Sequence, residues 1–148
     1  MKNLKLTILR VGAGFFAIIA MLTGLRQFLG GVNGALEDYE LGYVPYESIA
    51  GLDNDLRFLA VCWFIVGVSL AVGAVLPRKK PDFILLGLLV VVLGGFARLY
   101  GFLEYGPIPH EYIPITIEFI GGVPLLLLFA SWRQEEQGAP AGNTKKLA

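Results

Sequence analysis

The sequence is poor in charge, in cysteine and in histidine. Of its 148 residues, 16% are charged and the formal net charge is zero, whereas about a quarter of a typical soluble domain is charged. This low, balanced charge gives no reason to expect a nucleic-acid partner. The single cysteine, Cys62, excludes an intrachain disulfide and a Cys-x-x-Cys redox centre. The single histidine, His110, cannot form a histidine-based metal site alone, so we expect no metal and no cofactor.

The sequence also lacks the short motifs of common enzyme classes. It has no Walker motif, no HExxH, no GxSxG and no nucleotide-binding fingerprint. No set of serine, histidine and aspartate stands at a plausible depth. We therefore assign no catalytic residue and favour a non-enzymatic protein, while an enzyme that uses Glu118 as acid or base stays an open alternative.

Apolar residues and glycine take the place of the missing charge. The chain is 55% hydrophobic with a mean hydropathy of +0.66, and it has 19 glycines. About 20 apolar residues cross roughly 30 Å of hydrocarbon, and glycine lets helices pack closely in lipid. Four runs reach this length, at residues 8–29, 56–76, 83–103 and 113–132. The sequence predicts an all-α, integral membrane four-helix bundle over residues 1–133, with a flexible cytoplasmic tail at 134–148.

The basic residues predict the orientation of the bundle. Most of the 12 lysines and arginines precede the first run, separate the second from the third, or follow the fourth. They are Lys2, Lys5, Arg10, Arg78, Lys79, Lys80, Arg133, Lys145 and Lys146. The positive-inside rule makes this side cytoplasmic, with both termini on it. The first run is longer than the apolar part of a signal peptide, so we expect it to stay as a membrane helix.

Residues between and within the spans give further expectations. A long outer loop is predicted at residues 30–54, as a functional segment along the membrane interface or as a simple lid. Asp53 is expected to cap the second helix, because a carboxylate there accepts backbone N–H groups. Pro124 is expected to kink the fourth helix. Trp132 is expected in the interfacial aromatic belt.

The stretch 94–122, GGFARLYGFLEYGPIPHEYIPITIEFIGG, contains the sharpest signal. A Gly-Pro-Ile-Pro turn around Ile108 separates two apolar helices. Arg98 and Glu118 lie ten positions before and after Ile108, which places them at similar depth. A lone charge at membrane depth costs about 2.5–3.5 kcal/mol on insertion scales. We therefore predict that Arg98 and Glu118 form an ion pair facing the protein interior.

Other charges lie near the same outer end of the predicted bundle. We expect them to gather with the pair in one polar layer, as candidate ligand-binding residues. The six candidates are Arg26, Asp53, Asp55, Arg57, Arg98 and Glu118. Two interpretations stay open. The layer is either a closed ion-pair network that orders the helices or a pocket for a lipid headgroup or small anionic ligand.

Three segments resemble a known family. NDLRFLAVCWFIVGV, GGFARLYGFLEYGPIP and the following IEF are similar to a domain-of-unknown-function family of small bacterial four-helix integral membrane proteins, and more distantly to DoxX-type bundles. The resemblance covers about residues 9–129. It implies a multi-pass protein of the bacterial cytoplasmic (inner) membrane. It carries no established activity, and Arg57, Arg98 and Glu118 match polar positions of the family whose role it does not define.

These observations favour a non-enzymatic membrane protein that binds a lipid headgroup or small polar ligand, or assists a partner at that site. The expected partners are membrane lipids, with a second copy of the chain or another membrane protein as further options. A transporter or channel subunit is one alternative; the apolar cytoplasmic halves argue against a single-chain conduit but leave an oligomeric pore open. An enzyme acting on a lipid or isoprenoid through Glu118 is the other.

Overall fold

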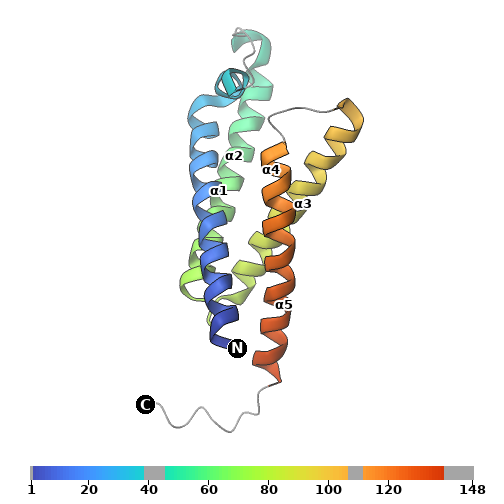
Figure 1. The fold of residues 1–148 in the computed structure, drawn as a ribbon. Helices are drawn as coiled ribbons and strands as arrows, with labels where there is room; N and C mark the ends of the chain where they lie inside the picture. The colour runs from blue at the N-terminus through green and yellow to red at the C-terminus, as the bar shows by residue number, and fades with distance from the viewer. Residues whose placement is uncertain (1, 39–45, 107–111, 139–148) are drawn as a thin grey trace.

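The computed structural model describes residues 2–38, 46–106 and 112–138, and every regular element in these ranges is helical. The elements are α1 (Lys2–Asp38), α2 (Tyr46–Val75), α3 (Pro81–Tyr105), α4 (Tyr112–Ile117), the π-helix η2 (Glu118–Gly122) and α5 (Val123–Gln137). The last three follow one another without interruption and form a single rod (Figure 1).

The described residues form four rods that are long and apolar enough to cross a membrane. The spans are Asn3–Gly34, Ala50–Val75, Pro81–Glu104 and Tyr112–Gln137. This result confirms the predicted all-α bundle of membrane-spanning helices. Large apolar side chains are exposed along all four rods, as expected where the surrounding solvent is hydrocarbon.

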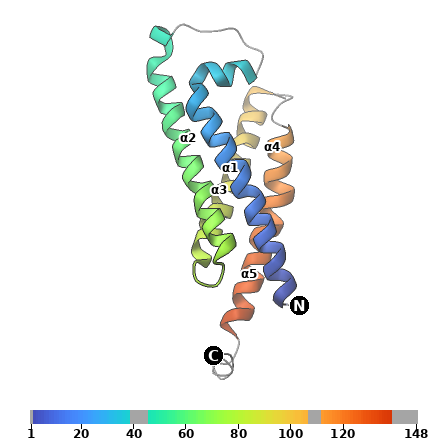
Figure 2. The same ribbon diagram turned by 90° about the vertical axis from the view of Figure 1, so that its left-hand side faces the viewer.

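The two ends of the bundle differ (Figures 1 and 2). The start of α1, the turn from α2 to α3 and the end of α5 lie together at one end, called here the basic end because it carries Lys5, Arg78 and Arg133. The end of α1, the starts of α2 and α4 and the end of α3 lie at the opposite end, called the far end. The cytoplasmic position of the basic end stays a prediction.

Glycines bring α1 and α2 into close contact. A Cβ atom on Gly24 would lie 2.8 Å from Ala60 O and 2.9 Å from Phe64 N, both backbone atoms of α2. A Cβ atom on Gly67 would lie 2.9 Å from Ala17 O on α1. The two helices therefore pack backbone against backbone, a contact that substitutes for the hydrophobic effect inside lipid.

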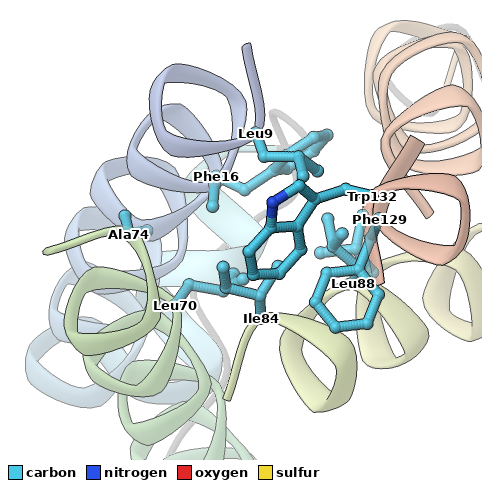
Figure 3. Close-up of a cluster of buried hydrophobic side chains, with 11 residues drawn as sticks. Leu9, Phe16, Leu70, Ala74, Ile84, Leu88, Phe129 and Trp132 are labelled. Atoms are coloured by element: carbon cyan, nitrogen blue, oxygen red, sulfur yellow. The ribbon is translucent and has the colours of Figure 1, made fainter. Parts of the chain in front are cut away.

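The apolar core lies toward the basic end and surrounds Trp132 (Figure 3). Trp132 is 1% exposed, so its predicted place in the interfacial aromatic belt is wrong. The largest side chain of α5 instead fills the space where all four rods converge. Its neighbours in the core include Leu9, Phe16, Leu70, Ile84, Leu88 and Phe129.

Polar contacts fasten α5 to the rest of the basic end. Lys5 Nζ donates to Ser131 Oγ at 2.8 Å and pairs with Glu135. Arg78 Nε lies 3.7 Å from Glu136 Oε1. The flexible tail was predicted to begin at residue 134, whereas α5 continues to Gln137, and these contacts stabilise its last turns. Residues 139–148 of that predicted tail lie outside the described residues.

The outer loop predicted at residues 30–54 is largely wrong. Residues 32–38 and 46–54 are helical, and residues 39–45 lie outside the described part of the chain. The expectation fails because an apolar run marks the segment that lies in hydrocarbon, whereas a helix continues into the more polar residues beyond it.

The fourth rod departs from α-geometry at Glu118–Gly122, and Pro124 follows two residues later. Proline lacks the N–H that an α-helix needs, and its ring clashes with the carbonyl four residues earlier. A π-helical turn at this place relieves the clash. The distortion predicted at Pro124 thus takes the form of a widened turn.

The contact between α1 and α2 gives a matched pair of substitutions. Gly24→Ala should lower the free energy of unfolding by about 1–3 kcal/mol, because the added methyl group meets backbone that cannot move aside alone. Gly14→Ala on the same helix is the control, since nothing beyond the adjoining backbone of α1 lies within 4 Å of its Cβ position. Denaturation by SDS in mixed micelles measures both. Equal effects of the two variants would contradict the close contact.

Candidate functional site

The far end is shaped by a break in α1. Gly31 has φ 59° and ψ −151°, outside helical geometry and in a region that is essentially restricted to glycine. The chain turns there, and the segment after Gly31 runs across the bundle axis (Figure 2). Such a break leaves carbonyl groups before it and N–H groups after it without helical partners.

Asp53 and Arg57, four residues apart on α2, supply those partners; we call this pair the clasp. Asp53 Oδ1 accepts the backbone N–H of Val32 at 2.8 Å. Arg57 Nε donates to Asp53 Oδ2 at 2.6 Å. Arg57 Nη1 donates to Phe28 O and, at 3.3 Å, to Leu29 O. The clasp therefore bonds to α1 on both sides of Gly31.

The clasp corrects the prediction made for Asp53. This residue does not cap α2, because it lies inside that helix, which begins at Tyr46. It caps the second segment of α1 instead, through the N–H of Val32. The sequence thus predicts correctly that Asp53 accepts a backbone N–H at a helix start, but the prediction names the wrong helix. Gly31 was missed, although the doublet Gly30–Gly31 in the sequence was a signal for it.

The second Arg–carboxylate pair joins α3 to η2. Arg98 Nε donates to Glu118 Oε1 at 3.2 Å, which confirms the predicted pair. Glu118 comes close to α3 because Gly95 has no side chain; a Cβ there would lie 3.1 Å from Glu118 Cβ. The side chain of Glu118 is 11% exposed, whereas that of Arg98 is 40% exposed. Arg98 therefore faces the interior less completely than expected.

Arg26 belongs to neither of these hydrogen-bonded pairs and lines a cavity of about 530 Å³ at the α1 break. Among the described residues, the others that line it are Leu22, Leu25, Leu29, Gly30 and Gly34. They lie on both sides of Gly31, so the cavity occupies the bend. Asp55, the last of the six candidates, is exposed on α2.

The six candidates thus have different surroundings. Asp53 and Arg57 bond to each other and to the backbone of α1. Arg98 bonds to Glu118, Arg26 lines a cavity and Asp55 lies on the surface. Within the described ranges, no group of three or more His, Cys, Asp or Glu side chains could hold a metal ion. The predicted turn at Ile108 and His110 lie outside these ranges.

Four apolar rods of membrane length, with arginine–carboxylate pairs at the far end, define a multi-pass α-helical membrane protein. The chain belongs to the family DUF4345, a domain of unknown function, whose sequence model matches residues 8–135. This confirms the resemblance to a four-helix family of unknown function. Comparisons with the curated proteins and with the solved structures found no match. A bacterial origin and a relation to DoxX stay predictions.

The break in α1 predicts a sharp contrast between adjacent glycines. Gly31→Ala should destabilise the protein by more than about 2 kcal/mol, because alanine cannot readily adopt this φ and ψ and its Cβ would overlap Asp53 Oδ1. Gly30→Ala has open space around its Cβ and should be near neutral. Thermal unfolding in detergent measures the difference. Similar midpoints for the two variants would refute the break.

The Arg98–Glu118 pair predicts an asymmetric double-mutant cycle. Arg98→Ala removes the cation that is bonded to a largely buried carboxylate and should cost about 3 kcal/mol. Glu118→Ala should cost less, because Arg98 is already partly exposed. The double variant should show a coupling of about 0.5–3 kcal/mol. SDS denaturation of the four proteins checks this, and a coupling near zero would rule out the pair as a stabilising contact.

Proposed function

We propose that this protein binds an anionic lipid of the surrounding bilayer in the cavity at the α1 break, and that it does so without catalysing a reaction. The observation that supports this most directly is the lining of the cavity. One arginine, Arg26, lies beside three leucines in a space of about 530 Å³ that is open to the surroundings. A lipid has a charged headgroup and an apolar chain, and the cavity offers a guanidinium group for the first and leucine side chains for the second.

The headgroup chemistry follows from arginine. A guanidinium group has five N–H donors and binds phosphate with two parallel hydrogen bonds. It can therefore bind a phosphate while it keeps another partner. Arg26 lies five residues before Gly31, about 7.5 Å along the helix axis. This position near the end of the first span suits contact with a headgroup phosphate.

The chain of the lipid has a matching surface. Leu22, Leu25 and Leu29 follow the helical spacing i, i+3, i+7 and so lie on one face of α1. All three are exposed. A hydrocarbon chain can lie along this face while its headgroup phosphate contacts Arg26. The apolar wall favours a lipid over a small water-soluble anion.

The alternatives have weaker support. A conduit needs polar groups at several depths, whereas the core cluster toward the basic end consists of apolar side chains apart from the indole N–H of Trp132. An enzyme that uses Glu118 would need this carboxylate next to substrate. Glu118 is instead buried against α3 and does not line the cavity that contains Arg26.

A lipid-dependent thermal shift tests the proposal. The full chain in detergent should be stabilised more by phosphatidylglycerol than by phosphatidylcholine with the same acyl chains, because a ligand that binds the folded state raises its stability. Arg26→Gln should abolish this difference, since the phosphate loses its charged donor.

The matched control is Arg78→Gln, which removes the same charge from a 63% exposed side chain at the basic end. It should keep the preference for phosphatidylglycerol. If both variants lose the preference equally, the effect reflects general surface charge and the proposed site is wrong.

A further inference from the structure

We infer that Asp53 and Arg57 are positioning residues for this lipid site: from α2, they set the angle of the α1 break and thereby shape a cavity whose described lining residues all belong to α1. This inference rests on the proposed function for its ligand. The claim that the clasp sets the angle at Gly31 is testable without any lipid.

The shape of the cavity depends on the angle at Gly31. Leu22, Leu25, Arg26, Leu29 and Gly30 come from the first arm of α1, and Gly34 comes from the second. A change of angle at Gly31 moves Gly34 relative to Arg26. The space available to a headgroup beside Arg26 therefore opens or closes with the bend.

Gly31 cannot hold that angle by itself. Glycine has access to both signs of φ and to more backbone conformations than any other residue. Hydrogen bonds to both arms must select one angle, and the clasp makes them. Arg57 bonds to the carbonyls of Phe28 and Leu29 on the first arm, and Asp53 bonds to the N–H of Val32 on the second.

The clasp also lies outside the cavity. Neither Asp53 nor Arg57 lines it, and Asp53 is only 4% exposed. The 2.6 Å bond between the two side chains joins the two sets of backbone contacts into one unit. The pair thus acts on a ligand through the backbone of α1 and not by touching it, so losing it should weaken binding without changing the groups that meet the headgroup.

The distance between two spin labels, one on each arm of α1, reports the angle at Gly31. They are placed at Ile18, which is exposed on the first arm, and at Leu36 on the second, after the exposed Cys62 has been replaced by serine. The parent protein should give a narrow distribution of distances between the labels. Arg57→Gln should broaden it, and its affinity for phosphatidylglycerol should fall about tenfold, because only the fraction with the correct bend binds.

Arg10→Gln is the matched control. Arg10 Nε also donates to a backbone carbonyl across α1 and α2, to Ala74 O at 3.0 Å, but at the basic end. This variant should lose a comparable bond while it keeps both the narrow distribution and the lipid affinity. Arg26→Gln should separate the two properties, keeping the bend and losing the affinity.

The outcomes distinguish the two claims. A narrow distribution in Arg57→Gln, or a broad one with unchanged affinity, overturns the positioning role and leaves the lipid site in place. A parent protein that does not prefer phosphatidylglycerol overturns the lipid site, and the distances still decide whether the clasp holds the bend. If Arg57→Gln does not fold, Arg57→Lys decides: it should recover part of both properties together, and normal affinity with a broad distribution would overturn the inference.

Discussion

A backbone that stops being helical near the end of a membrane span needs hydrogen-bond partners other than water, and the far end of this protein is organised around that requirement. The break at Gly31 exposes carbonyls on one side and an N–H on the other. One carboxylate and one guanidinium from the neighbouring helix satisfy both. Because the two groups have opposite charge and bond to each other, they bring no net charge to this depth. Unpaired, either group would be costly here.

The two ends of the bundle are held by different combinations of contacts. Toward the basic end, the four rods converge on Trp132 and the core is apolar, with Lys5 and Glu135 joining α1 to α5 at its edge. At the far end, the hydrogen bonds and ion pairs of the clasp and of Arg98–Glu118 act together with aromatic packing between Phe102 and Tyr112. Dispersion contacts tolerate small shifts of a helix, whereas hydrogen bonds fix orientation. At the far end, such directional bonds join α2 to both sides of the bend in α1, beside the cavity that contains Arg26.

Hydropathy alone predicted the four spans, because length and apolar content are what a bilayer selects. The Arg98–Glu118 pair also followed from sequence, since a tight turn between two helices places equidistant residues at one depth. The clasp could not be predicted from the sequence. Asp53 suits a helix start wherever one occurs, and only the folded chain shows that the start lies in α1. Trp132 was misplaced for a related reason: an aromatic residue at the end of an apolar run looks the same in sequence whether it meets lipid headgroups or three other helices.

The π-helical turn at Glu118–Gly122 has a consequence for the register of the fourth rod. A π-turn contains one residue more than an α-turn, and one residue corresponds to about 100° of rotation around a helix. Everything before the turn is therefore rotated by that amount relative to an unbroken α-helix continuing from α5. Without the surplus residue, Glu118 would be rotated away from its present place opposite Gly95, and a different side chain would meet this glycine. The ion pair between Arg98 and Glu118 thus depends on the π-helical geometry of Glu118–Gly122 as much as on the two charges.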